Sequence, residues 1–173
     1  MVRHAKTRTR PAPEEIKRLK RDLGLDKQFL APVKSYVRFT KTSQQIIGQD
    51  NTVPIWWDER DYNVGGGGFL SSFSVIVPPN MGGLWRVRAV INLDGATVKP
   101  NSNYRAELWV NDALFEYESN QAVTARQMSA RFFDEVPLKV DDEVQIRLTN
   151  NTTGGTVTVD AGSYMACQFL GAL

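Results

Sequence analysis

Acidic and aromatic side chains that share one short stretch are the first feature of this sequence that could do chemistry. Trp56, Trp57 and Tyr62 lie beside Asp58 and Glu59. Glycoside hydrolysis uses two carboxyls held roughly 5–10 Å apart across a cleft. Because neighbours in one segment do not supply that separation by themselves, we expect a surface loop that a tryptophan anchors to the body. A glycan- or receptor-binding surface formed by the three aromatic residues is the alternative.

Other residue types that support catalysis are scarce. His4 is the only histidine and lies near the chain's start, so we expect no Ser-His-Asp relay, Cys-His pair or histidine metal site in the body. Cys167 is the only cysteine, which excludes a four-cysteine zinc site and predicts a small hydrophobe inside a strand. Glycines 65–68 lack the Lys-Ser/Thr of a phosphate loop, and Asp141–Glu143 lacks EF-hand spacing. We therefore expect no enzyme, no metal and no cofactor.

Short segments with a two-residue hydrophobic period fill the chain from Ser35 onward. Asn111-Asp112 separates two of them, and both residue types tolerate the positive φ of a tight hairpin turn. Eight to ten such strands are typical of an antiparallel β-sandwich or jelly roll. The expected strands lie within residues 35–41, 73–79, 84–93, 104–110, 113–117, 121–133, 142–150, 155–161 and 162–173.

The first 34 residues differ from the rest in charge and pattern. They carry ten Lys/Arg and four Asp/Glu, whereas residues 35–173 carry eleven and fifteen. Residues 13–23 begin with Pro-Glu-Glu, have apolar residues at helical spacing and precede Gly24, which predicts a short amphipathic helix. A helix of about eleven residues is marginal alone in water and should dock on another surface. The charge asymmetry is typical of an arm that binds a negatively charged partner, with a solvated leader as the alternative.

Membrane and nucleic-acid partners are not expected. No stretch approaches 18 uninterrupted apolar residues, and no apolar segment follows the basic start as a secretory signal would require. The basic residues of the arm would attract phosphate without regard to sequence. No aromatic side chains interleave with them, so a base-stacking platform is absent.

The C-terminal segment, 162–173, is apolar in both of its alternating sets. One set is Met165, Cys167 and Phe169, and the other contains Tyr164, Ala166, Gln168 and Leu170. A strand with one wet face would show a more polar second set. The pattern therefore predicts a strand covered on both sides, either by a partner subunit or by a second sheet of the same chain.

Five segments, in order, resemble one known family. Pro79, Gly83 and Trp85 hold the places of a Pro-Gly corner and the aromatic residue that starts the next strand, and Asp112 and Asp141 stand where the family usually has glycine. The chain resembles the globular head of the complement subcomponent q family, the jelly roll shared with tumour necrosis factor. The five segments are 36–41, 69–93, 104–115, 137–148 and 162–173.

The resemblance implies a homotrimer, with the last strand near the three-fold axis. On that basis we expect Met165, Cys167 and Phe169 in the core and the other set toward the neighbouring subunits, while the reverse assignment stays open. The residues expected at the trimer interface are Tyr164, Ala166, Leu170 and Leu173.

Within this family the chain resembles small bacteriophage virion proteins, which implies a non-enzymatic structural protein. It would be a capsid decoration, head-fibre or tail-fibre subunit, made in the host cytoplasm and located on the virion. The predicted domains are an anchoring arm, 1–34, which would bind a capsid or tail protein, and a jelly-roll head, 35–173. A head that binds a host-surface glycan or receptor is the alternative. The expected anchoring residues are Arg3, Arg8, Arg10, Ile16, Lys17, Leu19, Lys20 and Leu23.

Overall fold

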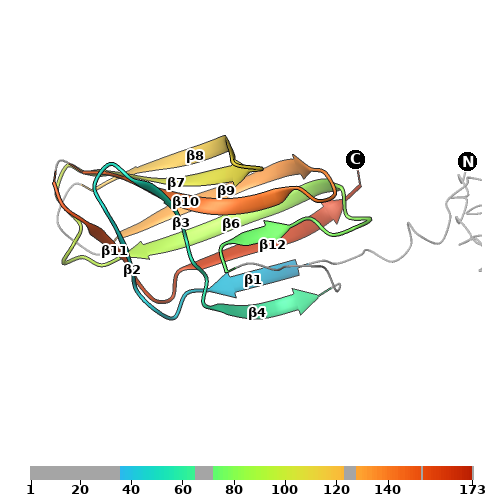
Figure 1. Ribbon diagram of the computed structural model, residues 1–173, viewed down its shortest axis with the longest axis horizontal. Coiled ribbons are helices and arrows are strands. Elements are labelled where there is room, and N and C mark those ends of the chain that lie inside the picture. The colour runs from blue at the N-terminus through green and yellow to red at the C-terminus, as the bar shows by residue number, and fades with distance from the viewer. Residues whose placement is uncertain (1–35, 65–71, 123–127, 153, 173) are drawn as a thin grey trace, which may run out of the picture. The chain divides into compact units, whose positions relative to one another are not determined.

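The computed structural model describes residues 36–64, 72–122, 128–152 and 154–172. Within these ranges the chain forms twelve β-strands and no helix (Figure 1). The helix expected at 13–23 lies outside the described residues, as does the rest of the arm. The strands are β1 (Tyr36–Thr40), β2 (Gln45–Ile47), β3 (Thr52–Pro54), β4 (Glu59–Val64), β5 (Ser74–Ile76), β6 (Gly83–Leu93), β7 (Asn103–Val110), β8 (Ala113–Gln121), β9 (Met128–Leu138), β10 (Glu143–Asn151), β11 (Val157–Val159) and β12 (Tyr164–Gly171).

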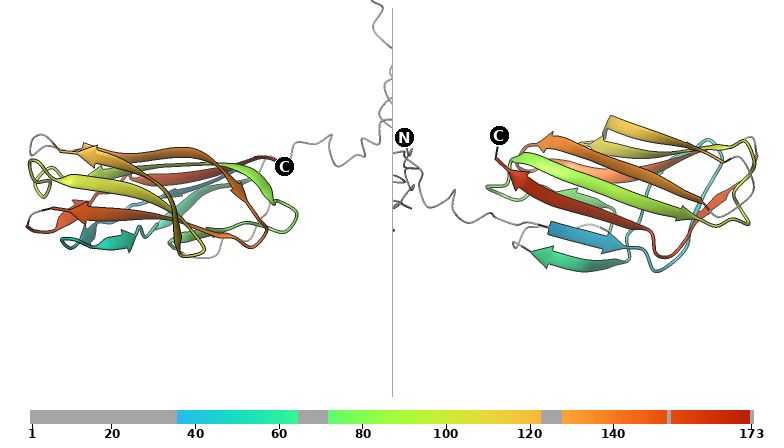
Figure 2. Two further views of the ribbon diagram at one scale, coloured as in Figure 1. Left: turned by 90° about the horizontal axis from the view of Figure 1, so that it is seen from above. Right: turned by 180° about the vertical axis from the view of Figure 1, so that it is seen from behind.

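The strands form two antiparallel sheets that pack as two layers (Figure 2). In the seven-stranded sheet, β9 pairs with one edge of β6, while β11 and β12 follow each other along the other edge. Beyond them, β12 pairs with β1, β1 with β4, and β11 with β2. In the five-stranded sheet, β10 pairs with β7 on one side and with β3 and β5 on the other. This architecture confirms the predicted all-β sandwich.

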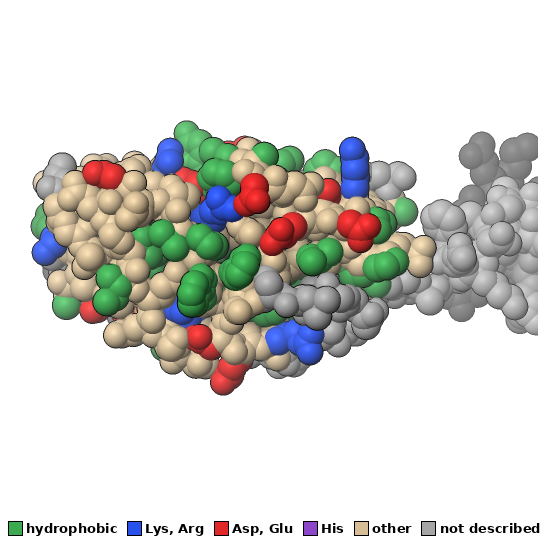
Figure 3. Space-filling view, viewed as in Figure 1, with side chains coloured by type: hydrophobic (Ala, Val, Ile, Leu, Met, Phe, Trp, Pro, Cys, Tyr) green, Lys and Arg blue, Asp and Glu red, His purple; other side chains and the backbone are tan. Residues whose placement is uncertain are grey.

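One strand of the five-stranded sheet, β8, pairs only with β7 among the described strands. Figure 3 shows hydrophobic side chains along the upper margin of the molecule, where Figure 1 places β8. Leu114, Phe115 and Tyr117 of this strand are between 45% and 47% exposed. An edge strand with exposed large side chains can accept another surface.

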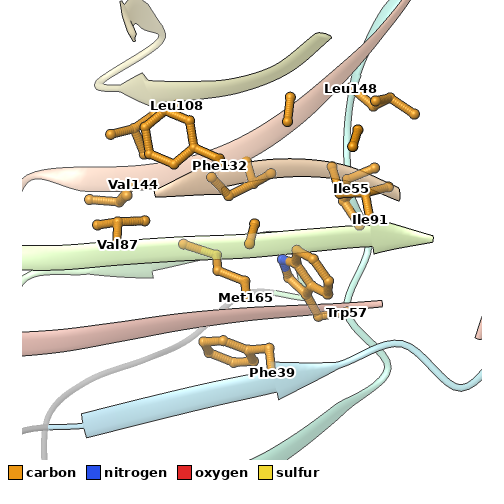
Figure 4. Close-up of a cluster of buried hydrophobic side chains, with 14 of the residues drawn as sticks. Phe39, Ile55, Trp57, Val87, Ile91, Leu108, Phe132, Val144, Leu148 and Met165 are labelled. Atoms are coloured by element: carbon orange, nitrogen blue, oxygen red, sulfur yellow. The ribbon is translucent and has the colours of Figure 1, made fainter. Parts of the chain in front are cut away.

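The core lies between the two sheets and follows from the alternation within each strand. In β6, Trp85, Val87 and Ala89 are buried, and the residues between them face outward. Facing side chains come from both layers, such as Leu108 and Val144 of one sheet and Met165 of the other (Figure 4). This confirms the two-residue period that the sequence shows in this strand.

The structure has twelve strands in the described residues, whereas the sequence predicted eight to ten. The prediction was low because several strands are too short to show the two-residue hydrophobic period. The strands β2, β3, β5 and β11 have three residues each. The segment expected as one strand at 121–133 also divides, since β8 ends at Gln121 and β9 begins at Met128.

Two turns explain why aspartate can stand where the resembled family has glycine. Asn111 and Asp112 have φ of 51° and 59°, and Asp141 has φ of 67°. These left-handed conformations are tolerated by Asn and Asp better than by other non-glycine residues. A hydrogen bond also links the two turns, because Asn111 Nδ2 donates to Asp142 Oδ1 at 2.8 Å.

Candidate interaction surface

The aromatic and acidic stretch between β3 and β4 is divided between core and surface. Trp57 is buried in the core (Figure 4), whereas Trp56 is 59% exposed. Trp57 anchors the loop to the body, as the loop interpretation predicted, and its burial removes it from the candidate ligand residues. Tyr62 lies in β4, outside the residues whose side chains the structure describes. Trp56 is therefore the one described aromatic residue that this alternative retains.

Asp58 closes this loop against the β1–β2 connection. Its carboxylate accepts hydrogen bonds from the backbone N–H groups of Thr42 and Ser43, both at 2.8 Å, and from the Ser43 hydroxyl. The buried Lys41 donates its Nζ to the Trp56 carbonyl at 2.9 Å and lies 3.8 Å from Asp58. The carboxylate is therefore occupied by its own chain.

The hydrogen bonds set the ionisation of this cluster. Burial by itself would raise the pKa of Asp58, but the hydrogen bonds from Ser43 and Thr42 and the charge of Lys41 outweigh it, and the pKa lies below its ordinary value. Burial lowers the pKa of Lys41, which the charge of Asp58 offsets in part.

Acid should therefore destabilise the fold through Asp58. Because the folded-state pKa is the lower one, the stabilisation is fully present above the unfolded pKa and is lost as the pH falls through the folded pKa. We expect the wild-type chain to lose stability more steeply than Asp58→Asn below about pH 4. Urea midpoints measured across this range test it, with the exposed neighbour substitution Glu59→Gln as control. Equal slopes for wild type and Asp58→Asn would contradict the prediction.

The last strand, β12, separates its two sets of side chains as expected. Met165 and Cys167 lie in the core, and Phe169 packs on Trp85 with ring centroids 5.4 Å apart. Burial raises the pKa of Cys167 to about 12, so the thiol stays protonated and unreactive. Tyr164 and Ala166 belong to the opposite, outward face of the seven-stranded sheet.

The strand register arranges this outward face in three rows that cross β1, β12, β6 and β9 in turn. We refer to these twelve residues as the sheet face; Figure 2 (right) shows the strands that carry it side by side. The rows are Tyr36–Gln168–Arg86–Glu135, Arg38–Ala166–Arg88–Phe133 and Thr40–Tyr164–Val90–Arg131.

A hollow of about 140 Å³ lies in the sheet face around the small side chain of Ala166. Ala166 is only 2% exposed, because larger side chains surround it, whereas Phe133 at the end of its row is 58% exposed. The residues that line the hollow are Tyr36, Arg86, Arg88, Phe133, Ala166 and Gln168.

The sheet face is basic and aromatic. The guanidinium carbon of Arg38 lies 4.6 Å from the centre of the Tyr164 ring, and that of Arg88 lies 5.9 Å from it. Arg86 pairs with Glu135 at 2.5 Å. No acidic partner of Arg88 is found among the residues that the structure describes. Such a surface favours an acidic, apolar binding partner.

Of the predicted interface residues, the structure places Tyr164 and Ala166 together on the sheet face and leaves Leu170 exposed at the end of β12. Leu173 and all eight expected anchoring residues lie outside the described ranges. Sequence reasoning missed the arginines and Phe133. The alternation in 84–93 places Arg86 and Arg88 on the same side of their strand, but only the register shows that they flank Ala166.

Clusters of metal-ligating side chains and membrane-spanning helices are both absent from the residues that the structure describes. Among those residues, no group of three or more His, Cys, Asp or Glu side chains is close enough to hold a metal ion. No helix there has the length and hydrophobicity to cross a membrane.

Comparisons with known proteins match the fold and not the sequence. No protein-family model and no curated protein matches the chain. Among solved structures, the PRD1 vertex protein P5 superposes with a TM-score of 0.60 at 12% identity, covering 80% of this chain and 98% of that one. Murine APRIL gives 0.59 at 9% identity, covering 79% and 99%. The globular domain of zebrafish complement 1qA gives 0.55 at 5% identity, covering 81% and 100%. The chain thus has the jelly-roll fold of the tumour necrosis factor and complement 1q heads.

Proposed function

We propose that this chain is a non-enzymatic structural subunit of a phage-like virion, a homotrimeric jelly-roll head that the residues 1–34 attach to the particle. The observation that carries the proposal is the outward side of β12. Tyr164 and Ala166 lie there in the middle of a sheet, and Leu170 is exposed at its end. The same face carries Phe133 and several arginines, and aromatic residues and arginine are enriched at protein interfaces. The family resemblance implies that the occupant is a second and third copy of the chain.

The virion assignment has two supports. One structural neighbour is a vertex protein, P5 of PRD1, and a vertex is a position on a particle. The chain also combines a basic arm with an acidic body, which suits attachment to an acidic capsid or tail surface. The non-enzymatic part rests on residue chemistry, since the body has no histidine and Asp58 is held by its own backbone.

Light scattering coupled to size-exclusion chromatography tests the trimer. We expect the full chain to elute with three times its own mass, and a chain that stays monomeric at high concentration overturns the proposal. Deleting residues 2–24 then tests the arm separately. The shortened head should remain a trimer because the sheet face is intact, but it should no longer join particles during assembly. Normal incorporation of the shortened head would show that the arm is not the anchor.

A further inference from the structure

The edge of β8 differs from the sheet face in the sign of its unpaired charge. It carries Leu114, Phe115, Glu116 and Tyr117, which we refer to as the β8 edge. By its pairing with β7, Glu116 points to the side of Leu108, whereas Tyr117 points to the opposite side, where the Arg105 guanidinium carbon lies 5.0 Å from its ring centre. Three of the eight exposed large hydrophobic side chains in the described residues belong to it. Apolar and aromatic groups of this size, left in water along an edge strand, favour burial against another surface.

The acidic residue of this edge has no cation to neutralise it within the part of the chain that is described. The Glu116 carboxylate accepts a hydrogen bond from the Tyr117 backbone N–H at 2.9 Å and forms no ion pair with a described residue. By contrast, Glu107 on the neighbouring β7 is buried and paired with Arg105 at 2.8 Å.

A complementary cation lies on the sheet face. Arg88 is exposed, lines the hollow around Ala166 and has no acidic partner among the described residues. Its neighbour Arg86 is already neutralised by Glu135. The hollow is several times the roughly 30 Å³ that one water occupies in the liquid, so it has room for a side chain.

The sheet face and the β8 edge are different patches of the same chain. A contact between them therefore joins unlike surfaces of identical subunits. A contact between different patches of identical subunits is head-to-tail, and it either closes into a ring or continues as a filament. Each copy offers a basic aromatic face and an acidic aromatic edge, so a ring would use both surfaces of every subunit. Opposite charge across an interface also fixes the register of the partners.

We propose that the sheet face of one copy receives the β8 edge of the next, and that Arg88 pairs there with Glu116 of the neighbouring copy across the hollow. This inference rests on the proposed homotrimer and deepens it by naming the partner of each surface. Exchanging the two charges on the full chain tests it. Arg88→Glu and Glu116→Arg should each weaken assembly at least about tenfold, because each places like charges opposite one another. The double variant should recover most of that loss.

The readout is the concentration at which the trimer dissociates, measured by light scattering for wild type, both single variants and the double variant. Lys99→Glu, an exposed charge reversal in the loop before β7, is the matched control and should leave assembly unchanged. Circular dichroism confirms that each variant is folded. Should a reversal prevent folding, Arg88→Gln and Glu116→Gln remove the same charges with less disturbance and must also weaken assembly. Added salt should raise the dissociation concentration of the wild type.

The outcomes separate this inference from the proposed function. A wild-type monomer overturns the trimer and the pairing together. A wild-type trimer that neither single variant weakens overturns the pairing alone, and so does a double variant that assembles no better than the singles. In the last case the hollow and the β8 edge have different occupants.

Discussion

Replacing Trp85 by alanine is expected to lower the free energy of unfolding by about 3–5 kcal/mol. The indole is fully buried at the start of β6, packs on Phe169 and donates its Nε1 hydrogen to the Met81 carbonyl at 2.9 Å. Truncation would leave a large cavity in the core between the two sheets and would also leave the Met81 carbonyl without its donor. Both effects add to the lost transfer free energy of the ring.

Chemical denaturation followed by circular dichroism measures this loss, and Trp56→Ala is the matched control. Trp56 is exposed, so its removal should change the free energy of unfolding by no more than about 0.5 kcal/mol. All samples need the same protein concentration, because association stabilises the folded state by mass action. Similar losses for the two tryptophans would contradict the assignment of Trp85 to the core.

Gly83→Ala is expected to be the second severe substitution, with a loss of about 2–5 kcal/mol from backbone strain and overpacking together. Gly83 begins β6 with φ of 153°. A Cβ there would lie 2.2 Å from the Gly171 carbonyl oxygen and 2.8 Å from the Ala172 Cα. Because both obstacles are backbone atoms, relief requires that the end of β12 move away from β6.

Gly154→Ala separates the cost of backbone strain from the cost of overpacking. Gly154 has a similar φ of 151°, but a Cβ there meets nothing within 4 Å. It should show the backbone cost alone. Urea denaturation of both variants gives the difference, which we assign to the close approach of β6 and β12. If both variants lose the same free energy of unfolding, the close contact of the new Cβ with Gly171 does not contribute to the loss.

Both severe substitutions act at the same end of β12, and this links stability to the proposed assembly. The Trp85–Phe169 contact and the Gly83–Gly171 approach fix where the strand lies against β6. The outward side of the same strand carries Tyr164 and Ala166. We therefore expect any folded fraction of either variant to assemble less well, since the register of the sheet face depends on this contact.

The sequence by itself determined the class of fold and the two sides of the longer strands. The alternation in 84–93 separates Trp85 from Arg88, and in the structure Trp85 is buried while Arg88 faces outward. The turn at Asn111-Asp112 was also predictable, because positive φ is a local property of those residue types. Local steric preference and the two-residue period of a strand are sufficient for these conclusions.

Only the tertiary structure decided which side chains share a surface. Neighbouring tryptophans looked equivalent in sequence, yet Trp57 is buried and Trp56 is exposed. Ala166 and Arg88 became neighbours because β12 pairs with β6 in one register, and a shift by one residue would have sent the opposite set to the outside. Period two assigns a side chain to one face of its strand, but the register and order of strands depend on packing between residues far apart in the chain. The hollow in the sheet face is a product of that packing.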